Sequence, residues 1–287
     1  MNKVTIKDIE NVSFDILKQS KSLGVFPTPV DNIVQYCELK VDRENCLSKI
    51  PKNYLAKASE TLKRALRKLR GAVDIGEKVI NLDLTRPVNA QRFVQLHETG
   101  HSALPWQRKT FEYYDDDDTL NPDVKIVFEA EANFFASATL FQLDRFDEEA
   151  SLLELTIRSP LALSKKFGGS VHATIRRYVE RCPKRCALLV IEKDGILNFK
   201  VRNYFQSPSF TKEFGVLKWP ESLGPDQAFI VDCSFRKMNT NGQFLYKGEN
   251  GDITFQYHFF SNSFNYFVMV LPFGEKIKSN VKIFVIE

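Results

Sequence analysis

The sequence predicts an α+β protein: a mainly helical N-terminal part with a small sheet, followed by a β-rich C-terminal domain. Up to residue 181, apolar residues mostly recur at helical spacing, and only residues 78–84 alternate as a half-buried strand does. Beyond Cys186, short strand-like runs are separated by turn signals, and more than half of the 24 phenylalanines lie there. We therefore expect two domains, at residues 1–183 and 184–287.

The composition is that of an ordinary globular protein. The 287 residues are 43% hydrophobic and 26% charged, which allows a sizeable core. The net charge of +4 neither requires nor excludes a nucleic-acid partner. Five cysteines at scattered spacings fit reduced thiols better than a disulfide framework. The N-terminus lacks the apolar stretch of a signal peptide, and no apolar run has the length of a membrane span, so we expect a cytoplasmic protein.

The first part of the chain alternates helical stretches with breaks at proline and glycine. Asn89 suits the N-cap of a helix that ends before Pro105, and Asn121-Pro122 starts another helix. Between these helices, the run Asp115 to Asp118 predicts a solvated loop that begins at Trp106. The expected elements are helices at 13–23, 30–37, 53–70, 89–104 and 122–141, and a strand at 78–84.

Residues 161–181 predict two short helices joined at Gly168-Gly169. This pair could contact DNA as a helix-turn-helix, with Arg176 and Arg177 on its second helix, or could simply complete the helical domain. The strand-like runs that follow are at 186–192, 196–201, 228–234, 243–247, 253–259, 265–271 and 281–287.

The candidate site is the pattern His97-Glu98-Thr99-Gly100-His101. Two histidines four residues apart lie on one face of a helix and can bind a single metal ion. They share this face with Leu96 and Leu104, so both imidazoles should point inward. The acid between them, Glu98, lies at the edge of the face, where a metal-bound water would sit.

A third ligand is expected on the helix that starts at Pro122. We place Glu131 on its apolar face, together with Val124, Val127 and Phe135. A buried carboxylate is costly unless it is paired or bound to metal, so Glu131 is the expected ligand. The alternative is a core glutamate paired with an arginine. Glu129 lies about 200° away around the helix, so both acids should not face the same ion.

Three ligands leave the fourth position of a zinc ion open for water, as in catalytic sites. Glu98 is expected to take a proton from that water as it attacks a carbonyl, and to deliver the proton to the leaving amine. A substrate peptide could pair with the strand at 78–84. The developing oxyanion needs a further donor, for which Tyr113, Tyr114 and His172 are candidates.

Together these segments resemble the ImmA/IrrE family of zinc metallopeptidases from bacteria and their mobile elements. The matching segments are RFVQLHETGH at 92–101 and EAEANFFASATLF at 129–141, with weaker similarity at 27–41 and 163–180. The resemblance implies a zincin-like metallopeptidase domain that binds Zn²⁺ through His97, His101 and Glu131, with Glu98 as the catalytic acid and base. The chain departs from the family at residues 140–143, where Leu-Leu-Met-Pro is common, and in a longer acidic loop at 112–118.

Members of this family typically cleave a DNA-binding repressor, and some carry a C-terminal sensor-like domain. We therefore predict a zinc-dependent endopeptidase that cleaves a regulatory protein, with residues 184–287 as a sensor or regulatory domain. One alternative is a DNA- or protein-binding regulator on the same scaffold with little or no proteolysis. Another is a metalloenzyme that acts on a non-peptide bond.

Overall fold

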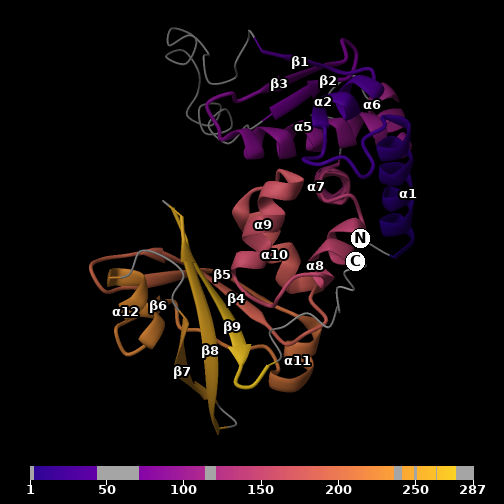
Figure 1. The fold of residues 1–287 in the computed structure, drawn as a ribbon. Coiled ribbons are helices and arrows are strands. Elements are labelled where there is room, and N and C mark those ends of the chain that lie inside the picture. The colour runs from indigo at the N-terminus through magenta and orange to yellow at the C-terminus, as the bar shows by residue number, and fades with distance from the viewer. Residues whose placement is uncertain are drawn as a thin grey trace, which may run out of the picture. The chain divides into compact units, whose positions relative to one another are not determined.

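The computed structural model describes residues 3–43, 71–113, 121–235, 241–248, 251–262 and 264–275. It confirms the α+β class, with a three-stranded and a six-stranded sheet among helices (Figure 1). The chain forms two compact units: unit 1 is Met1–Phe146 with Lys165–Ser170, and unit 2 is Asp147–Ser164 with Val171–Glu287. These units divide the chain differently from the predicted domains. No helix in the described ranges is long and apolar enough to cross a membrane.

Unit 1 is built around one helix, α5, which packs against the small sheet on one side and against α7 on another. In the sheet, β3 lies in the middle, parallel to β1 and antiparallel to β2. The elements that belong wholly to this unit are α1 (Lys3–Gln19), α2 (Val30–Tyr36), β1 (Lys40–Asp42), β2 (Gly71–Asp74), β3 (Val79–Leu82), α5 (Val88–Ala103), α6 (Pro105–Tyr113) and α7 (Pro122–Leu140).

The ends of α5 and α7 follow from local sequence. α5 begins after Pro87 and ends at Leu104, whose extended backbone leads into Pro105. Asn89 does not cap it; its side chain donates a hydrogen bond to the carbonyl of Gly169. The predicted cap of α7 is confirmed, because Asn121 Oδ1 accepts a hydrogen bond from the backbone N–H of Asp123 at 2.9 Å.

Gly100 allows α5 and α7 to approach closely. A Cβ atom at this position would lie 3.0 Å from Phe135 Cδ1 and 3.3 Å from Ala132 Cα, both tighter than ordinary contact. Ala132 and Phe135 are completely buried, so neither can move into solvent to make room. The glycine inside the motif therefore sets the distance between the two helices that carry the candidate site.

Two further expectations for this part of the chain were wrong, and two cannot be compared. The first helix begins at Lys3 and not at residue 13. Trp106 does not start a loop, because residues 105–113 form helix α6. The predicted helix at 53–70 and the acidic run 115–118 lie outside the described residues.

Unit 2 is organised on an antiparallel sheet with strand order β6-β5-β4-β9-β8-β7. Ala187 to Ile191 of β4 are all fully buried, as expected for a strand in the middle of a covered sheet. The remaining elements are α8 (Arg145–Ser151), α9 (Arg158–Phe167), α10 (Val171–Arg181), β4 (Ala187–Lys193), β5 (Phe199–Gln206), α11 (Pro208–Phe214), β6 (Ser222–Leu223), α12 (Ala228–Phe235), β7 (Asn241–Gly248), β8 (Gly251–Ser261) and β9 (Tyr266–Pro272).

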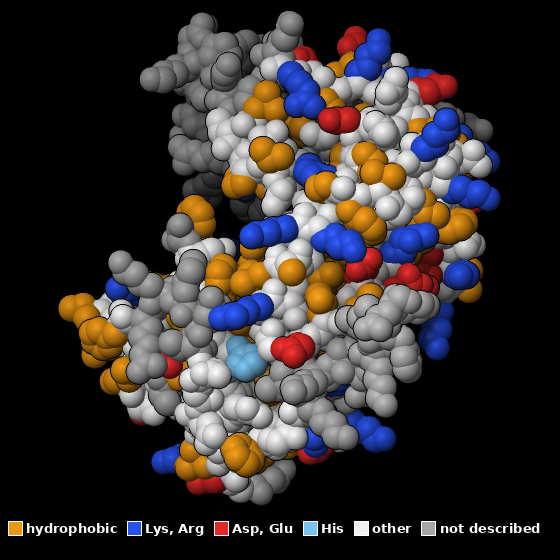
Figure 2. Space-filling model, in the orientation of Figure 1, with side chains coloured by type: hydrophobic (Ala, Val, Ile, Leu, Met, Phe, Trp, Pro, Cys, Tyr) orange, Lys and Arg blue, Asp and Glu red, His pale blue; other side chains and the backbone are white. Residues whose placement is uncertain are grey.

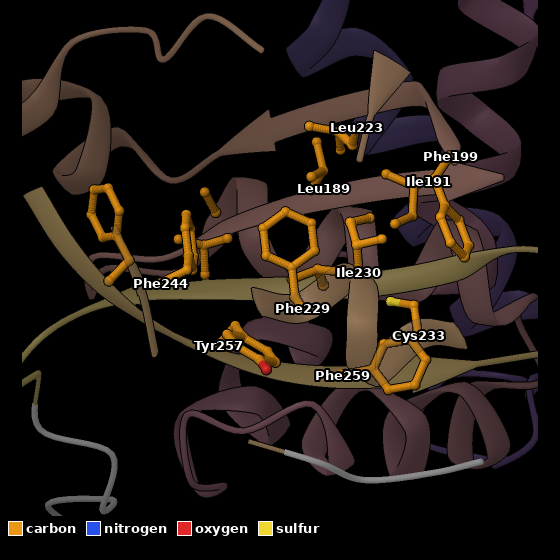
Figure 3. Close-up of a cluster of buried hydrophobic side chains, with 14 of the residues drawn as sticks. Leu189, Ile191, Phe199, Leu223, Phe229, Ile230, Cys233, Phe244, Tyr257 and Phe259 are labelled. Carbon is orange, nitrogen blue, oxygen red and sulfur yellow. The ribbon is translucent and has the colours of Figure 1, made fainter. Parts of the chain in front are cut away.

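The aromatic core predicted for the C-terminal part lies between this sheet and α12 (Figure 3). Residues 228–234 were expected to form a strand, but they form helix α12. Phe229, Ile230 and Cys233 are buried at helical spacing, while Val231 is 42% exposed. A short apolar run does not by itself distinguish a strand from a buried helix. The predicted strand at 281–287 lies outside the described residues.

Candidate metal centre

α5 presents the two histidines of the motif to the same point. The Nε2 atoms of His97 and His101 lie 3.2 Å apart, and the rings meet edge to face. Their side chains are only 14% and 10% exposed, so the apolar surroundings limit access of water to the imidazoles. The prediction that both imidazoles point inward is confirmed.

The carboxylate nearest to these nitrogens is that of Glu129 on α7. Glu129 Oε2 lies 3.3 Å from His97 Nε2, and Glu129 Oε1 lies 3.6 Å from His101 Nε2. One ligand atom from each of these three residues lies within 4.8 Å of the others. The side chain of Glu129 is half exposed, so the group opens to solvent on the side of the acid.

The spacing of these atoms fits a small divalent ion with nitrogen and oxygen ligands. Zinc binds such atoms at about 2.1 Å in a tetrahedral arrangement, which places any two ligand atoms roughly 3.4 Å apart. The two Nε2 atoms are 3.2 Å apart, and they lie 3.3 and 3.6 Å from Oε2 and Oε1 of Glu129, so each distance is close to this value. The donor set of two imidazoles and one carboxylate is also one that zinc uses in catalytic sites.

Glu131, the third ligand expected from sequence, points elsewhere. It is 5% exposed, and its Oε2 accepts hydrogen bonds of 2.8 Å from Trp106 Nε1 and from Gln107 Nε2. The alternative of a core glutamate paired with an arginine does not describe it either, since these donors are an indole and an amide. The structure thus places Glu129, and not Glu131, beside the histidine nitrogens.

Glu131 is buried as expected, together with Phe135, but burial does not identify which acid of α7 lies beside the histidines. Val124 and Val127, which defined the apolar stripe, are 36% and 47% exposed. The residues of α7 that lie against Gly100 of α5 are Ala132 and Phe135, which are completely buried. Alanine contributes little to a hydrophobic pattern, yet it permits the close helix contact at Gly100. Glu129 lies one helical turn before Ala132 and is carried to the histidines by that contact.

Glu98 lies on the sheet side of α5, where it is only 7% exposed. Burial raises the pKa of its carboxyl group to about 7, which the charge of His97 partly opposes. The backbone of Val73 in β2 forms a hydrogen bond with the same carboxylate. Gly71 of the same strand approaches so closely that an added Cβ would lie 3.0 Å from Glu98 Oε1.

The charges of the histidines and of Glu129 stabilise one another. Burial alone would lower the pKa of His97, but the hydrogen bond with Glu129 and the nearby charges of Glu98 and Glu129 outweigh it, so the pKa is raised. Conversely, the hydrogen bond with His97 and the charge of His101 lower the pKa of Glu129. The three side chains therefore favour an anionic carboxylate facing the imidazoles, as a cation site requires.

The sheet edge beside the site differs from the one predicted. The strand at 78–84 was expected to accept a substrate peptide, but the strand observed there, β3, is paired on both sides. In the described sheet β1 and β2 are the two edge strands, and it is β2 that contacts Glu98. With Gly71 and Ala72 among its four residues, β2 gave too weak a pattern to be recognised from sequence.

The three candidates for an oxyanion donor stay predictions. Tyr113 is the last residue of α6, its side chain is not described, and Tyr114 lies outside the described residues. His172 belongs to unit 2, where its ring packs against Phe205 and Phe267. Burial and the charges of Arg202 and Arg176 lower the pKa of His172.

The paired helices proposed to contact DNA are present as α9 and α10. α10 packs against β4 and β5 of the large sheet. Arg176 forms an ion pair with Glu180 and stacks its guanidinium 4.7 Å above the ring of Phe205, so this cation is used within the chain. On the face shown in Figure 2, lysines and arginines are scattered among acidic and apolar side chains.

Residues 55–178 match the family described as the IrrE N-terminal-like domain. The chain contains an IrrE N-terminal-like domain. The match includes the histidine pair, Glu98 and Glu129, and it confirms the resemblance to the ImmA/IrrE family. An IrrE N-terminal-like domain is a metallopeptidase-type domain, and the group at His97, His101 and Glu129 is where this one can hold a metal.

Among solved structures, a transcriptional regulator of Mycobacterium tuberculosis has a similar fold. The TM-score is 0.55 at 14% sequence identity, and the alignment covers 92% of this chain and 75% of that chain. At this identity the likeness shows the fold alone. A comparison with curated proteins gives no match.

Proposed function

We propose that this IrrE N-terminal-like domain is a zinc-dependent endopeptidase that cleaves a specific regulatory protein, a helix-turn-helix repressor. The observation that carries the proposal is the spacing of the His97, His101 and Glu129 ligand atoms beside a buried Glu98. This assignment replaces Glu131 by Glu129 in the ligand set expected from sequence. The family match supports a metallopeptidase-type reaction.

Zinc in such a site acts as a Lewis acid and lowers the pKa of a water molecule towards about 7. The residues of the chain supply the proton transfers. Glu98 accepts a proton from the attacking water while the water oxygen bonds to the carbonyl carbon. The same carboxyl group then protonates the amide nitrogen as the C–N bond breaks, which leaves a carboxylate and an amine.

A peptide substrate is supported by the position of β2 in the small sheet. β2 is one of the two edge strands among the described strands, and its Gly71 and Val73 lie beside Glu98. An extended peptide that added to such an edge would be held by backbone hydrogen bonds next to the proton-transferring carboxylate. A repressor as the substrate follows from the family resemblance, and it is the part of the proposal that needs a direct test.

The test uses the full chain and a helix-turn-helix repressor encoded next to its gene. The two purified proteins are incubated with zinc, with a chelator, and with the Glu98→Gln variant in place of the wild type. We expect one discrete cleavage that requires zinc and is absent with the variant. Cleavage at full rate by Glu98→Gln would overturn the mechanism. Steeply salt-dependent DNA binding without any cleavage would favour the binding-protein alternative.

A further inference from the structure

Gln107 of α6 connects the metal centre to Glu131. It is completely buried, and it makes three hydrogen bonds with its side-chain amide. Its Nε2 donates to Glu131 Oε2 at 2.8 Å and to the carbonyl of Phe128 at 3.1 Å. Its Oε1 lies 2.8 Å from His101 Nδ1. A single amide therefore bridges a buried carboxylate of α7 and a histidine of α5.

The chemistry of these partners allows only one orientation of the Gln107 side-chain amide. A carboxylate and a backbone carbonyl can only accept hydrogen bonds, so the amide nitrogen of Gln107 must face both of them. Its oxygen must then face His101, and an amide oxygen can only accept. His101 consequently carries a proton on Nδ1, so in the neutral ring its Nε2, the atom that faces His97 and Glu129, has the lone pair.

We propose that Glu131 and Gln107 are positioning residues that hold His101 in the tautomer that binds the metal. The proposal rests on the metal site put forward above, and it gives Glu131 a role other than that of a ligand. Metal-binding histidines generally donate their second N–H to a fixed acceptor, which orients the ring and increases the basicity of the ligand nitrogen. Here the acceptor is an amide, whose own orientation is fixed by the buried carboxylate.

The burial of Glu131 agrees with this role. An ionised carboxylate at 5% exposure is costly, and an apolar side chain would serve the packing of α7 better. The cost is reduced by two N–H donors, because Trp106 Nε1 and Gln107 Nε2 both point to the same oxygen. Of these two donors, Gln107 also contacts His101, and Trp106 helps to hold the carboxylate in place.

The first test reads the tautomer without any metal. Long-range ¹H–¹⁵N NMR spectra of the metal-free full chain distinguish protonated from unprotonated ring nitrogens. We expect the Nδ1–H form of His101 in the wild type and a shift towards the Nε2–H form in Gln107→Met, which keeps the volume but removes the acceptor. An unchanged tautomer in a folded Gln107→Met protein would overturn the proposal.

The second test measures zinc affinity by competition with a chromophoric chelator. Loss of such an outer partner typically weakens metal binding about 10–100-fold, and this is the loss expected for Gln107→Met. Gln107→Glu keeps an acceptor for His101 but sets a second carboxylate against Glu131, so it should also bind zinc more weakly. Wild-type zinc affinity in a folded Gln107→Met protein would count against the relay.

Gln142→Met is the matched control. Gln142 is also a buried glutamine of unit 1 with three hydrogen bonds, to Gly24, Val25 and Thr28. Its loss should lower stability but change neither the His101 tautomer nor zinc affinity. If Gln107→Met does not fold, Gln107→Glu makes the zinc comparison. A wild type that binds no zinc refutes the proposed function; a wild type that binds zinc no better than folded Gln107→Met refutes only the relay.

Discussion

Glu129 on α7 places its Oε2 atom 3.3 Å from Nε2 of His97 on α5, although the two residues are 32 positions apart in the chain. This relationship depends on the close contact of the two helices at Gly100, where α7 offers Ala132. The partner of the histidines is therefore selected by helix packing and not by the most buried acid. Glu131, which is far more buried, faces Trp106 and Gln107.

The first prediction separates the two acids of α7. Glu129→Gln removes the anionic oxygen that faces both imidazoles, and zinc affinity should fall more than about 100-fold, beyond the usual range for an outer partner. Glu131→Gln keeps an oxygen acceptor for Trp106, so its loss should stay within about 10–100-fold. Competition with a chelator measures both variants. The reverse order of the two losses would restore Glu131 as the ligand.

The second prediction concerns Glu98. Replacing Glu98 by Gln removes the group that accepts and returns the proton, which should lower the rate of peptide cleavage by about 10²–10⁴-fold. Zinc stoichiometry should be unchanged, because Glu98 is not among the three grouped ligands. Cleavage rate and bound metal are measured on the same preparations. Glu77→Gln, at an exposed glutamate of the same unit, is the control and should cleave as the wild type does.

The sequence revealed those parts of the site that depend on a single helix. His97, Glu98 and His101 are related by one helical turn, so their relative positions follow from the period of the helix alone. Glu129 and Gln107 could not be predicted in this way. The position of Glu129 depends on which face of α7 meets α5, and the small side chains that decide this leave no hydrophobic signal.

The same limit applies to the fold. The α+β class and the cap of α7 followed from periodicity and from Asn121, both of which act locally. Helix α6 was missed because the acidic run that follows it suggested a loop. Gln107 on this helix is buried by packing against other elements, which the local sequence does not reveal. Helix α12 was taken for a strand because the four consecutive apolar residues 228–231 satisfy either period.

The third prediction links zinc to stability. A ligand that binds only the folded chain adds free energy of unfolding, about 2.7 kcal/mol at a concentration 100 times its Kd. Thermal unfolding followed by circular dichroism should therefore shift to a higher temperature with zinc and return with a chelator. His97→Ala removes one of the three ligands and should abolish the shift. A zinc-dependent shift of equal size in His97→Ala would show that zinc binds elsewhere.

The last prediction concerns Gly100, whose missing side chain lets α5 and α7 meet. Gly100→Ala should gain up to about 1 kcal/mol from helix propensity, yet its Cβ would press on Phe135 and Ala132. Overpacking of this kind costs typically about 1–3 kcal/mol, so we expect a net loss of stability in urea unfolding. Because the contact also carries Glu129 to the histidines, zinc affinity should fall as well.

Gly76→Ala, at an exposed turn where an added Cβ would meet only Asp74 Oδ1 at 3.5 Å, is the control and should stay within about 0.5 kcal/mol of the wild type. A Gly100→Ala protein that is as stable as the wild type and binds zinc equally well would show that the helices have room to separate.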